Sequence, residues 1–303
     1  MYKLLIIISL ILIFFFQNPI ISLSIGLVTG FMLKNNLKDF IKYVGSKPLQ
    51  TGIVLIGFSI NFGTFSDLLL NYFPVISIFV VLTFILGLLI GRFFNSDTKF
   101  VYLISSATAI CGATAALAIS SIIKAKPNQI SLAIFIIFLM NTIALVVFPI
   151  TGRFLGLTDM QFGLFSALAI HDTGSVVGSG LLFSEDAAEI AATLKVGRTI
   201  WILPLIALVT YKMNDNGSVD LNHFPKFIIF FFIAIVISNL FNLPIQVYDM
   251  SKLLSIVFIN IGIFFIALQT KVEKINNLSN LFYPFLLWLN IILISFIVVT
   301  GLY

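Results

Sequence analysis

Two polar stretches inside otherwise apolar runs hold the residue types that could bind and move an ion. Ser105–Thr114 concentrates small and hydroxyl residues around one glycine, and Ile170–Gly180 combines a histidine, a carboxylate, three hydroxyls and three glycines. Ionisable residues at bilayer depth are costly and usually functional, whereas glycine lets a helix unwind beside a cavity. We therefore predict two broken helices, near Cys111–Gly112 and near Thr173–Gly178, whose breaks face each other at mid-membrane. The free N–H groups at the start of a half-helix would then face a bound anion.

A pair of cations follows in the next apolar run. Lys195 and Arg198 are three residues apart, so they share one helix face. Such a pair suits an anion such as sulfate or a carboxylate, which arginine can hold with two hydrogen bonds. Two other roles stay open, because the cations could neutralise Asp172 or extend toward lipid headgroups. An isolated cation pair in the bilayer would be costly, so Asp172 is expected to compensate it while the site is empty.

These segments supply the candidate site. The residues expected to bind the substrate are Thr108, Cys111, Gly112, Thr114, Thr173, Ser175, Lys195 and Arg198. His171, whose ordinary pKa is about 6.5, and Asp172 are expected to couple the site to a proton or another ion. The alternatives are structural: a tight contact of small residues at the first stretch, and an ion pair that pins two helices at the second.

The composition shows what kind of protein must position these groups. Of the 303 residues, 60% are hydrophobic and 10% are charged, with a mean hydropathy of +1.14. Soluble domains contain about 25% charged residues, so a soluble enzyme or a nucleic-acid binder is excluded. Two histidines and one cysteine are widely scattered, and no P-loop or familiar hydrolase motif occurs. We therefore expect no metal, no cofactor and no enzymatic activity.

The apolar runs predict an all-α polytopic membrane protein with about 10–11 transmembrane helices in one transporter domain, residues 1–303. The first two runs are short and could form one helical hairpin that crosses incompletely. Short loops leave no room for a soluble domain. The eleven runs cover residues 4–16, 19–33, 52–69, 73–90, 100–123, 130–151, 161–183, 190–211, 227–241, 253–270 and 281–302.

Loop charges predict the orientation. If all eleven runs cross and the N-terminus is inside, twelve cations lie inside and three outside, with Tyr303 outside; this bias is typical of a multi-pass plasma-membrane protein. The inside set includes Lys34, Lys38, Lys42, Lys99, Arg153, Lys271 and Lys274, and the outside set is Lys124, Lys126 and Lys252. Ile56–Leu68 can also be laid on Ile266–Leu278, which suggests inverted repeats over residues 18–152 and 158–303.

Several motifs together resemble the YeiH-like family of bacterial sulfate-exporter membrane proteins. They are Thr108-Ala-Ile-Cys-Gly-Ala-Thr114, Asn141-Thr-Ile-Ala-Leu145, Gln161-Phe-Gly-Leu164, Ile170-His-Asp-Thr-Gly-Ser-Val-Val-Gly178 and Lys195-Val-Gly-Arg-Thr-Ile-Trp201. The resemblance covers nearly the whole chain. It implies kinship with the clan of cation–proton antiporters and anion transporters, with about ten helices, inverted repeats and two crossed broken helices. The sulfate label of that family does not fix the substrate.

The function expected from these observations is secondary active transport of a small anion, such as sulfate, a sulfonate or a carboxylate, coupled to H⁺ or Na⁺. The alternative is a cation–proton antiporter of related fold that uses Asp172; an intramembrane enzyme with His171 and Asp172 is the least favoured. The expected partners are the anion, the coupling ion and the lipid bilayer, with no nucleic acid. We expect a bacterial plasma-membrane protein with a cytoplasmic N-terminus, and whether two copies form a homodimer stays open.

Overall fold

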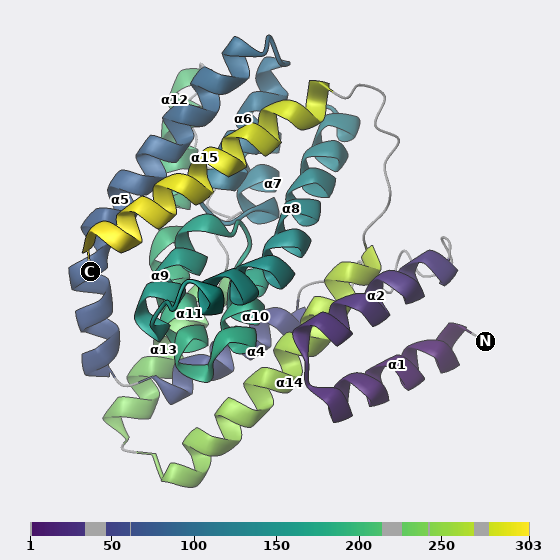
Figure 1. Ribbon diagram of the computed structural model, residues 1–303, viewed down its shortest axis with the longest axis vertical. Coiled ribbons are helices and arrows are strands. Elements are labelled where there is room, and N and C mark those ends of the chain that lie inside the picture. Colours follow the sequence, from purple (N-terminus) through teal and green to yellow (C-terminus); the bar gives the residue numbers. More distant parts are fainter. Residues whose placement is uncertain are drawn as a thin grey trace.

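A computed structural model describes residues 2–33, 47–60, 62–213, 226–241, 243–269 and 279–302, and every regular element in these ranges is a helix (Figure 1). The helices are α1 (Tyr2–Phe16), α2 (Pro19–Leu33), α4 (Lys47–Ser59), α5 (Phe62–Phe93), α6 (Thr98–Ala109), α7 (Ala113–Ile122), α8 (Pro127–Phe154), α9 (Asp159–Ala169), α10 (Thr173–Phe183), α11 (Glu185–Thr199), α12 (Ile202–Met213), α13 (Lys226–Leu240), α14 (Ile245–Gln269) and α15 (Ser279–Leu302).

Five stretches of the described chain are long and apolar enough to cross a membrane: α5, α8, the α11–α12 pair, α14 and α15. At 1.5 Å per residue, a helix of about 20 residues matches the hydrocarbon core of a bilayer. Their outward faces carry large apolar side chains such as Ile78, Leu293 and Ile297. The predicted class, an all-α polytopic membrane protein, is confirmed.

Three predicted runs have different boundaries in the structure. The runs over residues 52–69 and 73–90 were separated near Tyr72, but α5 continues through that point and through Pro74. The interruption comes earlier, between Ser59 and Phe62. The run over residues 190–211 begins earlier, at Glu185, and is interrupted at Ile200 and Trp201 between α11 and α12.

Helices α6 and α7 form a hairpin whose two ends lie together. The Lys99 ammonium, in the first turn of α6, donates to the carbonyl of Lys124, just after α7, at 2.8 Å. The Gln129 amide at the start of α8 donates to Asp97, the N-cap of α6, at 2.7 Å. With 12 and 10 residues, each arm is about 15–18 Å long, which is half of a bilayer core.

Helices α9 and α10 form a second hairpin of the same kind. The Ser184 hydroxyl, after α10, donates to Asp159, the first residue of α9. The rings of Phe162 and Phe183, near these same ends, stack with centroids 4.1 Å apart. The guanidinium of Arg153, at the end of α8, donates to the carbonyl of Leu182 at 2.8 Å. The predictions that residues 100–123 and 161–183 each cross the bilayer are therefore wrong.

The long helix α8 joins the two hairpins, so they enter the bundle from opposite ends, as Figure 1 shows with α6 and α7 above and α9 and α10 below. We call these ends the Lys99 end (Asp97, Lys99, Lys124, Gln129) and the Glu185 end (Arg153, Asp159, Ser184, Glu185). The prediction that placed Lys99 and Lys124 on opposite sides is wrong, and so is the one that separated Arg153 from Glu185.

Helices α1, α2, α4, α13 and α14 pack beside the hairpins, with α14 in contact with α1, α2, α4 and α10. α1 and α2 are joined at Gln17 and Asn18, and the Ser9 and Thr29 hydroxyls lie 3.3 Å apart, so these two runs form a helical hairpin. α2 runs parallel to α14, because the Ser22 hydroxyl donates to Asn260 at 2.9 Å while Gly30 lies against Leu268.

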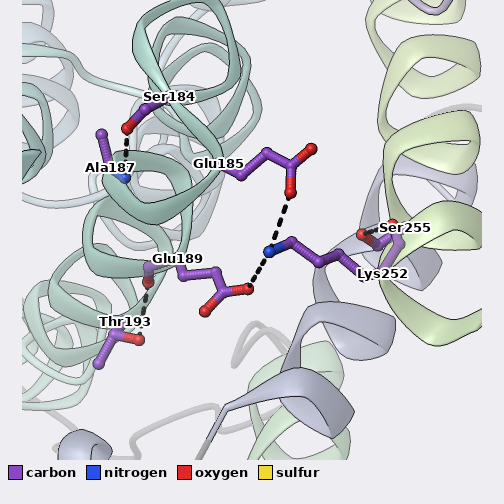
Figure 2. Close-up of polar contacts among 7 residues, drawn as sticks. All are labelled: Ser184, Glu185, Ala187, Glu189, Thr193, Lys252 and Ser255. Atoms are coloured by element: carbon purple, nitrogen blue, oxygen red, sulfur yellow. Dashed lines mark hydrogen bonds and ion pairs between the residues drawn. The ribbon is translucent and has the colours of Figure 1, made fainter. Parts of the chain in front are cut away.

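At the Glu185 end, α14 is tied to α11 by ion pairs. The Lys252 ammonium lies 2.9 Å from the Glu185 carboxylate and 3.4 Å from that of Glu189 (Figure 2). The predicted placement of these three residues on one side of the membrane is thus consistent with the structure. The predicted repeats over residues 18–152 and 158–303 stay a prediction, because much of Ile266–Leu278 lies outside the described residues, as do Lys34, Lys38, Lys42, Lys271 and Lys274.

Candidate functional site

The tips of the two hairpins touch each other in the middle of the bundle. The first tip is Ile110–Gly112 and the second is Ile170–Asp172. Gly112 has a φ of +65°, and a Cβ built on it would lie 3.3–3.5 Å from the Cβ, N and Cα atoms of Asp172. The prediction that two breaks face each other is confirmed. The second break lies earlier than predicted, because Thr173–Gly178 belongs to the regular helix α10.

Asp172 ends the second tip as the N-cap of α10. Its carboxylate accepts a hydrogen bond from the Ser175 amide at 2.8 Å. An N-cap aspartate satisfies one of the free N–H groups of a helix start and is favoured by the positive end of the helix dipole. Asp172 therefore holds the place that an anion would take at the start of α10.

Arg198 joins the last carbonyls of the two incoming arms, α6 and α9. Its Nε donates to the Ala109 carbonyl at 2.7 Å, and its Nη2 donates to that of Thr108. Its Nη1 donates to the carbonyls of Ala167 at 2.8 Å and Leu168 at 2.6 Å. A third carbonyl, that of Ile170, lies 3.4 Å from Nη1. The side chain is only 1% exposed.

Lys195, one turn earlier on α11, is also fully buried. Its ammonium donates to the Ile170 carbonyl at 2.7 Å. Asp172 makes no direct contact with either cation in the described structure, and the expected compensation is limited to a longer-range attraction between its carboxylate and Lys195. The compensating groups are carbonyls at the C-terminal ends of α6 and α9, where the helix dipole is negative.

His171 is fixed by Asn141 of α8. The Asn141 Oδ1 atom accepts the His171 backbone N–H at 3.1 Å and lies 3.0 Å from His171 Nδ1. Because an amide oxygen can only accept, Nδ1 must carry a hydrogen. The other ring nitrogen, Nε2, is buried and has no hydrogen-bond partner in the described structure. Asn141, which was not among the predicted site residues, therefore sets the tautomer of His171.

The predicted site residues differ in their exposure to solvent. Thr114 is exposed, and Asp172 and Ser175 are partly exposed, at the starting ends of α7 and α10. Thr108, Cys111, Thr173, Lys195 and Arg198 are buried. The structure brings all ten predicted site residues to the two tips or to the adjacent face of α11. The starts of α7 and α10 therefore lie on the solvent-accessible side of the site, whereas Lys195 and Arg198 lie against the C-terminal ends of α6 and α9.

One sequence signal for this arrangement is an internal pentapeptide repeat. Ser106-Ala-Thr-Ala-Ile110 and Ser166-Ala-Leu-Ala-Ile170 match at four of five positions and are 60 residues apart. Each ends its arm in the same way, with the isoleucine amide donating to the serine carbonyl at 3.2 Å and 3.1 Å. This repeat, with one long helix between its copies, identifies the two hairpin tips.

A family model described as conserved hypothetical protein 698 matches residues 5–282. A UPF0324 membrane protein of Vibrio parahaemolyticus is 38% identical over 239 residues, which cover 75% of this chain and 76% of that protein. One from Vibrio vulnificus is 33% identical over 267 residues, 86% of each chain. One from Streptococcus agalactiae is 29% identical over 295 residues, covering 91% of this chain and 88% of that protein. No solved structure matches. None of these names states a substrate.

Proposed function

For a chain that belongs to the conserved hypothetical protein 698 family of UPF0324 membrane proteins, we propose secondary active transport of a small anion across the bacterial plasma membrane. The single observation that carries this proposal is the meeting of two oppositely inserted hairpin tips, Gly112 against Asp172, in the middle of an apolar bundle. Backbone that leaves the helical state at membrane depth is tolerated where it lines a cavity or is covered by protein. Transporters place substrates at such paired helix breaks.

The anion binds at the starting ends of α7 and α10. The first N–H groups of a helix have no partner within it, and they carry the positive end of the helix dipole. Thr114 and Ser175 add hydroxyl groups on the accessible side. Sulfate, sulfonates and carboxylates all present several acceptor oxygens, so each fits this chemistry.

Asp172 provides the coupling to protons. In the empty site its carboxylate accepts a hydrogen bond from the Ser175 amide at 2.8 Å. An arriving anion needs the same donor, so it repels and displaces the carboxylate, which is then favoured in its protonated, neutral form. Anion and proton therefore enter together. Asp172 also supports the alternative, cation–proton antiport, because it is an ionisable carboxylate at the tips; in that case Na⁺ would compete with the proton.

The distribution of charge supports an orientation with the Lys99 end in the cytoplasm. Described cations at that end outnumber those at the Glu185 end, and such an excess is typical of cytoplasmic loops. Since α1 runs against α2, and α2 runs parallel to α14, the chain starts toward the Lys99 end. A cytoplasmic N-terminus follows. The cations at the Lys99 end are Arg92, Lys99, Lys124, Lys126 and Lys212, and those at the Glu185 end are Arg153 and Lys252.

A transport assay in proteoliposomes tests the proposal. Vesicles with an internal pH-sensitive dye receive inward gradients of sulfate, methanesulfonate or succinate, with choline as the only external cation. Internal acidification with at least one anion is expected for wild type. It is lost in Asp172→Asn and retained in the matched variant Asp159→Asn, whose carboxylate lies at the outer end of α9. Na⁺ flux in exchange for protons, with no anion flux, would instead establish the antiporter.

A further inference from the structure

Arg198 occupies a carbonyl cradle of the kind that holds a metal cation in other transporters. The cradle consists of the carbonyls of Thr108 and Ala109 from α6 and of Ala167, Leu168 and Ile170 from α9. In secondary transporters, unwound carbonyls and the C-terminal ends of half-helices coordinate the coupling Na⁺. We propose that the protein fills this cation site with its own Arg198, so that Na⁺ is not its coupling ion. This inference rests on the proposed transport function.

The helix ends that form the cradle carry enough negative charge to hold a monovalent cation. The C-terminal end of each helix carries roughly −0.5 elementary charge, so the ends of α6 and α9 together offer about −1. The Arg198 guanidinium supplies +1 and forms no ion pair with a carboxylate within the described residues. The Lys195 ammonium shares the Ile170 carbonyl of the cradle and adds a second positive charge beside it. A buried guanidinium without a carboxylate is therefore held by dipoles, as an alkali cation would be.

The geometry leaves Arg198 little capacity for an external anion. Guanidinium has five N–H donors. The Nε hydrogen goes to Ala109, the two Nη1 hydrogens go to Ala167 and Leu168, and one Nη2 hydrogen goes to Thr108. The flat face is covered by the Phe79 ring, whose centroid is 5.4 Å from Cζ. Arg198 is thus a positioning residue that sets the distance between the two tips.

Tethering has a functional consequence. A bound Na⁺ can drive transport with its own gradient, because it dissociates from the protein on the far side of the membrane. The Arg198 guanidinium is attached to α11 and cannot dissociate. The site keeps the tips together in every state that retains the cradle. Energy coupling must then come from another ion, and Asp172, the ionisable N-cap of α10 at the second tip, is the group that offers it.

Removing the Arg198 guanidinium should make the stability of the folded protein depend on a free cation in solution. The test measures the melting temperature of purified Arg198→Ala in choline chloride, NaCl and guanidinium chloride, each up to about 20 mM. Trp288 is a local reporter, because its indole N–H donates to the Ala169 carbonyl at 3.2 Å. The matched control is Arg153→Ala, which loses an arginine that donates to the carbonyls of Leu182 and Phe183 at the water-exposed end of α10.

We expect guanidinium, and more weakly Na⁺, to raise the melting temperature of Arg198→Ala in a saturable way, on the order of 3 °C, because a ligand that binds only the folded state stabilises it. Arg153→Ala and wild type should show no such rise. Equal behaviour of Arg198→Ala in all three salts would overturn the proposal. If Arg198→Ala does not fold, the same measurements are made on the wild-type protein. A saturable effect of Na⁺ on its melting temperature or on its anion uptake would overturn the proposal. The melting readout needs no transported anion, so it separates this inference from the proposed function.

Discussion

Replacing Gly112 with alanine tests the contact between the two tips, and Gly156 provides a matched control. Both glycines have nearly the same left-handed backbone, with φ values of +65° and +66°. An L-residue in that region costs about 1–2 kcal/mol. A new Cβ at Gly156 meets nothing within 4 Å, whereas one at Gly112 lies 3.3 Å from the Asp172 Cβ. The two variants thus share the backbone strain and differ in the contact.

The additional loss of stability in Gly112→Ala can be estimated from the hydrogen bond by which Asp172 caps α10. To relieve the contact, the second tip must move by a few tenths of an ångström, which weakens the cap on the Ser175 amide. Losing an N-cap costs about 1 kcal/mol. We therefore expect Gly112→Ala to be destabilised by about 1 kcal/mol more than Gly156→Ala, equivalent to about 2–4 °C in melting temperature.

Thermal unfolding in detergent and anion uptake in proteoliposomes measure the two effects. Gly156→Ala should melt earlier than wild type but transport with the wild-type dependence on pH. Gly112→Ala should melt earlier still and lose much of its uptake, because the anion and Asp172 compete at the displaced tip. Equal melting of the two variants, together with wild-type uptake by Gly112→Ala, would refute the contact between the tips as the basis of the site.

Three other predictions follow from the same geometry. Asp172→Asn keeps an N-cap side chain but no ionisable group, so it should fold with nearly wild-type stability and transport without proton dependence, as a pH titration of uptake would show. A cysteine at Lys124 should react with a membrane-impermeant maleimide from the cytoplasmic side and one at Glu185 from the other side, in a Cys111→Ser background; labelling of both from one side would contradict the opposed hairpins. Lys252→Ala should lower stability by less than about 1 kcal/mol, since its partner Glu185 is 60% exposed, and a larger loss that is insensitive to salt would show a deeper role for this pair.

Composition and hydrophobic runs determined the class of this protein. With 60% hydrophobic residues, most of the chain can only be helices with apolar outward faces. The two polar stretches were also visible in the sequence, because polar groups are expensive at bilayer depth and their position inside apolar runs marks the site. The contact of Gly112 with Asp172 is therefore the expected outcome of that reasoning.

The path of the chain through the bundle was decided by tertiary packing. A run of about 23 apolar residues is long enough to cross a bilayer once or to fold back on itself at a central break, and hydropathy is the same in both cases. Contacts at the helix ends, such as Asp97 to Gln129 and Ser184 to Asp159, distinguish the two, and they join residues 32 and 25 positions apart. The loop-charge count separated Lys124 from Lys99, and Arg153 from Glu185, for this reason.

The tertiary structure likewise decided which groups contact the buried charges of Lys195 and Arg198. From the sequence, Lys195 and Arg198 are cations in need of an anion, and Asp172 is the carboxylate inside the neighbouring apolar run. The structure instead gives them backbone carbonyls, which every residue possesses and which therefore leave no mark on the sequence. Helix ends become cation ligands only when two chain segments stop at the same place, and that coincidence exists only in the folded chain.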